Sequence, residues 1–251
     1  MKVGLLECDN VVGRFPELKG GYREMFAALL PRFTFRYYAA HHGQLPPSAS
    51  ECDAWLCTGS KYSVYDGTPW IANLAAFIRS LGEKRFVGIC FGHQMLAHAM
   101  GGQVAKAKQG WGVGVLDVEV LRKELWMDPP LQHLRIQHMH QDQVQRLPEK
   151  SLLLGKSAHC EVAMFRVGET MLGSDLLEQL RTCFLLLVAR GGRHRPRRDS
   201  GHTDTAHGGK RGEFKLGNVG ENEPGFEPLC QPGRNVECGV RVGRPVDAAH
   251  D

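Results

Sequence analysis

Residues 88–94 read Gly-Ile-Cys-Phe-Gly-His-Gln. An apolar run, Arg85–Cys90, predicts a strand that leads into this stretch, and a helix is predicted over Gly92–Met100. A residue at such a strand-to-helix corner is forced into a sharp, strained turn, which exposes its side chain at the carboxyl end of the strand. The flanking glycines, Gly88 and Gly92, leave room for the turn and for a substrate carbonyl. The pattern predicts that Cys90 is a nucleophile.

The chemistry of this corner suits a thiol. Cys90 stands at a helix N-terminus, where the helix dipole favours the thiolate form. The backbone N–H of Phe91 would point at an oxyanion that develops during attack. A free cysteine is more often a small buried apolar residue. Here the Gly-x-Cys-x-Gly frame between a strand and a helix favours the nucleophile.

The sequence on either side of the corner predicts an α/β fold. Upstream, strand patterns alternate with amphipathic helix patterns, which is typical of a parallel sheet with helices on both faces. Downstream, strand patterns follow one another without helices, which predicts an antiparallel section and a mixed, mostly parallel sheet. The predicted strands are Val3–Glu7, Phe33–Ala40, Asp53–Thr58, Gly110–Val120, Leu152–Leu154, Val162–Val167 and Thr170–Leu172, and the upstream helices are Leu18–Leu30 and Pro69–Leu81.

Composition excludes several classes of protein. Hydrophobic residues make up 42% of the chain and charged residues 23%, which is ordinary for a globular protein. A net charge of +4 gives no electrostatic reason to expect a nucleic acid or membrane partner. The eight cysteines form no C-x-x-C pair, so a zinc ribbon is not expected. Because Glu7 comes too early for a signal peptide, we expect a cytoplasmic protein with reduced thiols.

Four stretches together resemble the class I glutamine amidotransferases. Residues 88–94 match the nucleophile motif of that family, and Thr58–Asp66 resembles its oxyanion-hole loop. Trp111–Gly114 resembles the strand after the elbow helix. His140–Val144, followed by Leu-Pro, resembles the substrate-side loop of the single-domain, GMP-synthase-like branch. The resemblance covers residues 1 to about 173.

This resemblance implies a flavodoxin-like domain that hydrolyses a glutamine or γ-glutamyl amide through a Cys90 thioester. It implies Gly59 and Phe91 as the oxyanion donors and Gln94 as a contact to the amino-acid end of the substrate. His140 and Asp142 are implied as further substrate-binding residues. No cofactor is implied. A synthetase that accepts the ammonia would be a separate chain, because the sequence holds no Gly-x-x-x-x-Gly-Lys-Ser/Thr string.

The sequence departs from the family pattern after Gly173. The family supplies its general acid and the residue that orients it from a His-Pro-Glu string, and no such string occurs in the rest of this chain. We therefore expect a weak or inactive enzyme. The alternatives are a non-catalytic protein that binds glutamine or a γ-glutamyl compound, and a protein that uses the exposed thiol for redox chemistry.

Composition changes at the same point. Only nine Leu, Ile, Val or Phe residues fall within 191–251, about 15% of the segment, which is below the roughly 20% under which chains are commonly disordered. The predicted organisation is a family-like domain over 1–173, a helix of unrelated sequence over 174–190 and a disordered Gly/Arg/Pro-rich tail over 191–251. A shift of reading frame would produce such a C-terminus, and a genuine extension is the alternative.

Two groups of histidines outside the motifs could carry chemistry. His133, His138 and His140 lie close in sequence, but no nearby cysteine or carboxylate completes a ligand set, so no metal site is expected. His159 could replace the missing base. The family pattern instead places it on a loop before the strand Val162–Val167, which does not favour that role.

Overall fold

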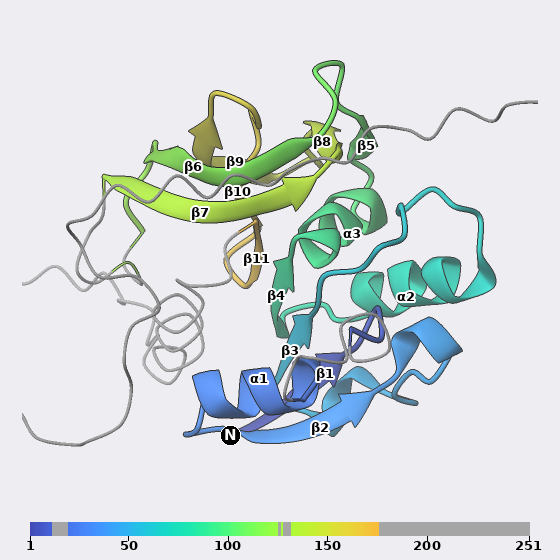
Figure 1. Ribbon diagram of the computed structural model, residues 1–251. Coiled ribbons are helices and arrows are strands. Elements are labelled where there is room, and N and C mark those ends of the chain that lie inside the picture. Colours follow the sequence, from blue (N-terminus) through green and yellow to red (C-terminus); the bar gives the residue numbers. More distant parts are fainter. Residues whose placement is uncertain (12–19, 125–126, 128–131, 176–251) are drawn as a thin grey trace, which may run out of the picture. The chain divides into compact units, whose positions relative to one another are not determined.

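The computed structural model describes residues 1–11, 20–124, 127 and 132–175 (Figure 1). Every described residue lies in the first of the two units into which the chain divides, 1–197. The helix expected over 174–190 and the disordered tail expected over 191–251 lie outside the described residues, apart from Ser174 and Asp175. No helix in the described part of the chain is long and apolar enough to cross a bilayer.

Strands and helices alternate through the first half, and strands dominate the second. The helices are α1 (Tyr22–Leu29), α2 (Pro69–Arg79) and α3 (Phe91–Ala99), with short 3₁₀ turns at Ala40–His42 and Ala49–Glu51. The first four strands are β1 (Lys2–Leu6), β2 (Thr34–Tyr38), β3 (Ala54–Cys57) and β4 (Arg85–Ile89). The later strands are β5 (Gln103–Lys106), β6 (Gly112–Val120), β7 (His133–His140), β8 (Asp142–Arg146), β9 (Ser151–Ser157), β10 (Met164–Val167) and β11 (Met171–Ser174).

The main sheet is mixed, as expected. Within the described residues it has nine strands in the order β2-β1-β3-β4-β11-β10-β9-β6-β7, and β5 pairs with β8 in a separate two-stranded sheet. The strands from β2 to β11 in this order are parallel to their neighbours. Those from β11 to β7 are antiparallel. The fold class predicted from sequence, an α/β protein with a mixed sheet, is confirmed.

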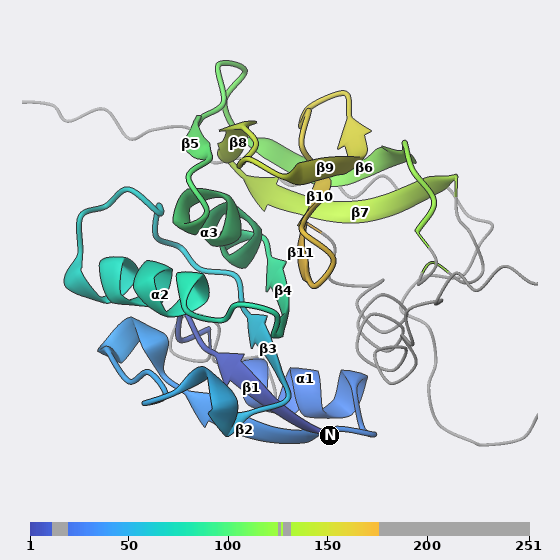
Figure 2. The same ribbon diagram turned by 180° about the vertical axis from the view of Figure 1, so that it is seen from behind.

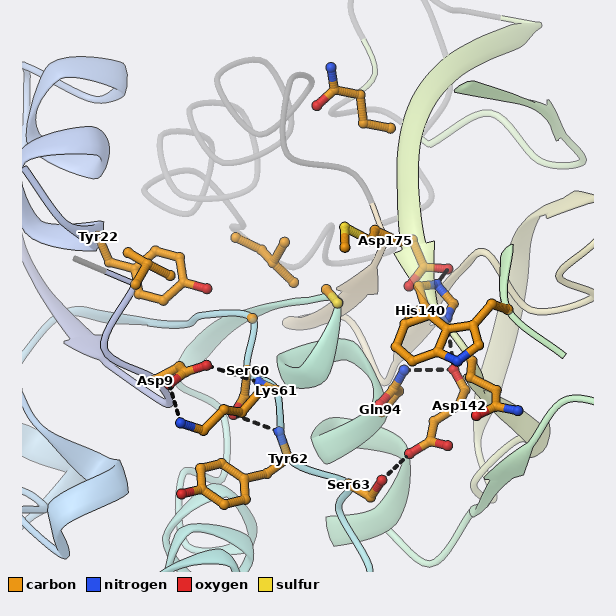
Figure 3. A pocket seen from close by; sticks show the side chains of 18 of the residues that line it. Asp9, Tyr22, Ser60, Lys61, Tyr62, Ser63, Gln94, His140, Asp142 and Asp175 are labelled. Carbon is orange, nitrogen blue, oxygen red and sulfur yellow. Dashed lines mark hydrogen bonds and ion pairs between the residues drawn. The ribbon is translucent and has the colours of Figure 1, made fainter. Parts of the chain in front are cut away.

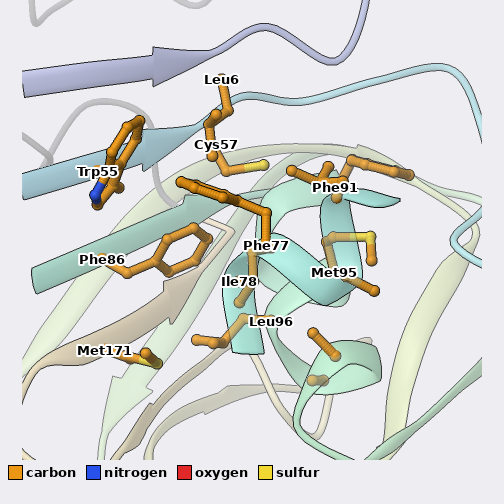
Figure 4. Packing of buried hydrophobic residues seen from close by; sticks show 14 of the residues in the cluster. Leu6, Trp55, Cys57, Phe77, Ile78, Phe86, Phe91, Met95, Leu96 and Met171 are labelled. Atoms are coloured by element: carbon orange, nitrogen blue, oxygen red, sulfur yellow. The ribbon is translucent and has the colours of Figure 1, made fainter. Parts of the chain in front are cut away.

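Helices cover both faces of the parallel section (Figures 1 and 2). Phe26 of α1 packs in a core with Val3 and Leu5 on one face, and α2 and α3 pack on the other face. Strands buried on both faces read as continuous apolar runs, which is why β1 and β3 could be predicted from sequence. On the second face Trp55 lies directly over Gly4, where a Cβ atom would come within 2.2 Å of the indole ring. Figure 4 shows this apolar layer between the sheet and α2 and α3.

Several predicted boundaries differ from the structure, those of the first helix and the last strand among them. The first helix begins at Tyr22 instead of Leu18, because Gly20 has a φ of +96° and Gly21 is extended. The Glu24 carboxylate accepts a hydrogen bond from the Gly21 N–H at 2.7 Å and so caps the helix start. The last strand, β11, runs through Ser174, one residue past the point where the family resemblance stops.

Strand β11 places the end of the described chain beside the strand-to-helix corner. It lies parallel to β4, with Ser174 opposite Ile89. The carboxyl ends of both strands therefore meet at one edge of the sheet, which is where α/β folds usually form their sites.

Candidate active site

Cys90 occupies a strained turn between β4 and α3. Its backbone has φ 51° and ψ −105°, which is rare for a residue with a side chain. The turn depends on close packing: a Cβ at Gly88 would lie 2.2 Å from the Gly92 carbonyl oxygen, and one at Gly92 would lie 2.5 Å from the Cys57 carbonyl oxygen. The Cys90 N–H donates to the Ser174 carbonyl at 3.2 Å, which ties the turn to the end of β11.

The surroundings of the thiol do not favour its ionised form. Burial and the negative charge of Asp175 raise the pKa of Cys90 to about 12. The Phe91 N–H faces the sulfur and lowers this pKa, but by less. The stabilisation of a thiolate expected from the helix N-terminus is present, and it is outweighed by desolvation and by a carboxylate that the sequence did not place here.

A cavity of about 660 Å³ opens onto Cys90 (Figure 3). Gly59, in the loop after β3, forms part of its wall, and a Cβ at this position would lie 4.0 Å from the Cys90 sulfur and 3.2 Å from the Tyr22 hydroxyl. Glycine therefore keeps open the approach between these two groups. The cavity lining also includes Gln94, His140, Asp142 and Asp175.

Gln94, His140 and Asp142 form one hydrogen-bonded unit in the cavity wall. The backbone carbonyl of Asp142 accepts from the Gln94 side-chain amide at 2.7 Å and from His140 Nδ1 at 2.8 Å. The Asp142 carboxylate accepts from the Ser63 hydroxyl and from the Tyr65 hydroxyl, the latter at 2.7 Å. These contacts join the loop after β3 to the start of β8, so they fix the two sides of the cavity relative to each other.

The cavity carries charges of both signs. Asp9 is buried, and its carboxylate contacts Lys61 at two points. It accepts a hydrogen bond from the Lys61 backbone N–H at 3.1 Å and lies 3.7 Å from the Lys61 ammonium group. Lys106 also lines the cavity, at the end of β5. A ligand with both an ammonium and a carboxylate group would meet complementary charges here.

Asp175 is the functional candidate that sequence reasoning missed, and it lies beside two buried histidines. Asp175 follows β11, is 5% exposed, and lies 3.2 Å from His140 Nε2 and 4.0 Å from His93 Nε2. Burial raises the pKa of Asp175. The charges of the neighbouring histidines lower it by more, so the net shift is downward. Burial lowers the pKa of His140, but Asp175 contributes most to a net upward shift. No local sequence motif marks Asp175, because its position beside Cys90 depends on the pairing of β11 with β4.

The structure brings the predicted site residues together. Cys90, Gly59, Gln94, His140 and Asp142 all line the cavity, and Phe91 contributes its N–H while its side chain packs in the core. Their roles as nucleophile, oxyanion donors and substrate contacts stay predictions. His159 is not part of the cavity lining; its ring packs at 5.4 Å from that of His138.

Comparisons with known proteins agree with the fold and the motifs. The family model for glutamine amidotransferase class-I matches residues 43–172. Gamma-glutamyl peptidase 4 of Arabidopsis thaliana is 30% identical over 164 residues, covering 61% of this chain and 65% of the relative. A subunit of the glutamine-hydrolyzing GMP synthase from Methanothermobacter thermautotrophicus is 28% identical over 122 residues, covering 47% of this chain and 64% of the relative. The chain thus spans just under two thirds of the length of each.

A solved glutamine amidotransferase from Thermotoga maritima superposes with a TM-score of 0.59 at 24% sequence identity, covering 70% of this chain and 75% of that one. At this identity the likeness shows the fold alone. The family model, in contrast, matches more than half of the sequence, including the nucleophile turn and the cavity-lining loops. This chain therefore belongs to the class I glutamine amidotransferase family.

Proposed function

We propose that this chain is a hydrolase of γ-glutamyl amides with low activity. In the proposed reaction the Cys90 sulfur attacks the side-chain carbonyl of glutamine or of a γ-glutamyl small molecule, and a thioester forms as ammonia or an amine leaves with the thiol proton. Water then hydrolyses the thioester, which releases the γ-carboxylate and restores the Cys90 thiol. The observation that carries the proposal is the strained turn at Cys90, which opens into a cavity beside Gly59 and presents the Phe91 N–H at the sulfur. The amides of Gly59 and Phe91 would hold the oxyanion.

The cavity suits the amino-acid end of such a substrate. A γ-glutamyl group carries an α-ammonium and an α-carboxylate, and the walls supply Asp9 for the first and Lys61 or Lys106 for the second. The Gln94 and Asp142 unit would position this end so that the γ-carbonyl reaches Cys90. The similarity to a protein named gamma-glutamyl peptidase supports a γ-glutamyl substrate. The similarity to part of a GMP synthase supports the alternative that a separate synthetase chain accepts the ammonia.

Low activity follows from the proton transfers. The Cys90 thiol, with a pKa of about 12, needs a base before it attacks, and the leaving amine needs an acid. The family obtains both from a His-Pro-Glu string that this sequence lacks after Gly173. General acid–base catalysis contributes about 10²- to 10⁴-fold, so the rate should fall by roughly that factor.

A labelling experiment tests the nucleophile. A chloroketone analogue of glutamine should alkylate Cys90 before any other cysteine, and excess glutamine should protect it. Peptide mass mapping would identify the modified residue. Cys160 is the matched control. It is a buried thiol that also lies beside Asp175, to which it donates a hydrogen bond, but it is not part of the cavity lining. Labelling that starts at Cys160, or that glutamine does not slow, would contradict the proposal.

The second candidate function is binding without catalysis. The raised pKa of Cys90 and the missing acid and base favour it, since neither affects the cavity that would hold the ligand. Calorimetric titration with glutamine and with γ-glutamyl peptides, together with an ammonia assay, separates the two. Saturable binding with no Cys90-dependent product over long incubation would identify a binding protein.

A further inference from the structure

Three buried side chains at the inner end of the cavity converge from two strands. His138 and His140 lie on β7, two residues apart, so both point to the same buried face of the strand. Asp175 follows β11. One potential ligand atom from each of the three lies within 4.8 Å of the other two. The side chains are 2%, 8% and 5% exposed, respectively.

The hydrogen bonds around His140 define which of its nitrogens is free. A backbone carbonyl can only accept, so the Asp142 carbonyl at 2.8 Å requires a proton on His140 Nδ1. The Nε2 atom of a neutral ring then presents its lone pair to the Asp175 carboxylate oxygen 3.2 Å away. Two electron-rich atoms at this distance need a cation between them. A carbonyl that holds the distal N–H is also the usual support of a metal-binding histidine.

A proton would satisfy only part of the cluster. It would join His140 to Asp175, although the two atoms are not aligned for a hydrogen bond. Neither ring nitrogen of His138 would gain a partner, and neither has one among the described residues. The His138 ring also lies against that of His140, with centroids 3.6 Å apart and the ring planes tilted by 45°, so a charged His140 would oppose any charge on His138. A divalent metal ion would bind all three side chains at once.

We propose that His138, His140 and Asp175 bind a divalent transition metal ion of the zinc type. Zinc binds imidazole nitrogen and carboxylate oxygen at about 2.0–2.2 Å, which places tetrahedral ligand atoms roughly 3.3–3.5 Å apart. The 3.2 Å between His140 and Asp175 already fits this spacing. The remaining separations, up to 4.8 Å, require one ring to move inward by about 1 Å.

Second contacts hold the carboxylate in place. The Cys160 thiol donates to Asp175 Oδ2 at 3.6 Å, and the His93 ring approaches Oδ1 at 4.0 Å. Because His140 and Asp175 also line the cavity, the fourth coordination position would face it and take water or a ligand atom. From the sequence no metal site is expected, because no nearby cysteine or carboxylate completes a ligand set with these histidines. The fold brings Asp175 to them.

The test is direct titration of the purified full chain, freed of metal by a chelator, with Zn²⁺ alone. We expect one ion per chain, bound in the micromolar range or tighter. His138→Gln and Asp175→Asn should each weaken binding by roughly tenfold to 100-fold or more. His133→Gln is the matched control, because His133 is exposed on the same strand and faces the other way. No stoichiometric binding, or equal loss in the control, would overturn the proposal.

Two further measurements keep the test valid if a variant folds poorly. Zn²⁺ should raise the unfolding midpoint of the unmodified chain and of His133→Gln, but not that of Asp175→Asn. X-ray absorption at the zinc edge of the unmodified chain should show nitrogen and oxygen neighbours with an imidazole pattern. A sulfur neighbour would assign the ion to a cysteine and overturn the ligand set. Neither measurement depends on catalytic activity, so failure here leaves the proposed hydrolase function standing.

Discussion

Strands β4 and β11 lie side by side and end at the same edge of the sheet, yet their ends differ. The end of β4 has the features of a nucleophile site: a strained Cys90, close-packed glycines before and after it, and a helix that begins at Phe91. The end of β11 provides a buried carboxylate, Asp175. In the family pattern, the segment after this strand leads instead to the His-Pro-Glu string. The Asp175 carboxylate raises the pKa of the neighbouring thiol.

The difference indicates that placing a nucleophile and moving protons are separable tasks in this fold. The turn at Cys90 is specified largely by local sequence, because Gly88 and Gly92 flank it within five residues and pack closely on each other. Under the proposed function, proton transfer would depend on the residues that come after β11, a strand more than eighty residues later in the sequence. A change of sequence after β11 can therefore remove the second function and leave the first in place.

Restoring the end of β11 should give the largest effect. We expect that replacing all residues after Gly173 with a family-type ending, Ile-Gln-Gly-His-Pro-Glu-Phe and onward, raises ammonia release from glutamine by about 10²- to 10⁴-fold, because an acid and a base return. That range corresponds to roughly 3–5 kcal/mol of activation free energy. A steady-state ammonia assay measures it. Cys90→Ala in the chimera is the control and should remove the gain; no gain would place the defect at β4.

Damage to the β4 end should appear first as a loss of stability. Gly88→Ala should lower the free energy of unfolding by about 3 kcal/mol, since its Cβ would meet the Gly92 carbonyl at 2.2 Å. Gly59→Ala is the matched control, because its nearest neighbour is the Tyr22 hydroxyl at 3.2 Å, the end of a side chain. It should change stability by less than about 1 kcal/mol and still slow labelling of Cys90. Equal denaturant midpoints for the two variants would contradict this account of the turn.

The pH dependence of labelling measures the coupling between the two strand ends. In metal-free protein, alkylation of Cys90 by iodoacetamide should rise about tenfold per pH unit from roughly pH 7 to 10, because the thiolate is a small fraction below a pKa of about 12. Asp175→Asn removes a charge that raises this pKa, so labelling should become several-fold faster at each pH. Rates from a quenched time course would show it. A plateau below about pH 9 in the unmodified chain would be inconsistent with the raised pKa of Cys90.

The smallest effect concerns the cavity wall. Tyr65→Phe removes the hydrogen bond from the Tyr65 hydroxyl to the Asp142 carboxylate and should cost about 1 kcal/mol of stability, because Tyr65 is partly exposed. Urea denaturation measures the change. Tyr62→Phe, in the same loop, is the control: that hydroxyl makes no hydrogen bond to the described residues, and its ring packs on Trp70. If both variants unfold at the same urea concentration, the hydrogen bond from Tyr65 to Asp142 does not stabilise the loop after β3.

Sequence patterns predicted the parallel half of the fold well and the far half less well. Strands such as β1 and β3 are buried on both faces and give continuous apolar runs. Strand β7 alternates buried and exposed residues, but its last two buried positions are His138 and His140, so the apolar signal fades after Ile136. The family motif indicated the His140 region without indicating a strand.

The candidate site shows the same division. Cys90, Gly59 and Gln94 could be predicted because their motifs are local and specific. Asp175 could not, because its importance arises from the register of β11 against β4, which is a long-range property. A sequence that leaves the family pattern at Gly173 gave no reason to expect a buried carboxylate two residues later.

The central claim is that Cys90 can still attack through its small thiolate fraction, while the acid that protonates a leaving amine and the base that helps water to cleave the thioester are missing. An activated γ-glutamyl ester with a nitrophenol leaving group tests it most directly, because nitrophenolate leaves without protonation whereas an amine does not. We predict a burst of about one nitrophenol per chain, a long-lived γ-glutamyl adduct mapped to Cys90, and slow turnover afterwards. The matching γ-glutamyl nitroanilide should give almost no product. Equal, steady hydrolysis of both compounds with no accumulated adduct would contradict the account.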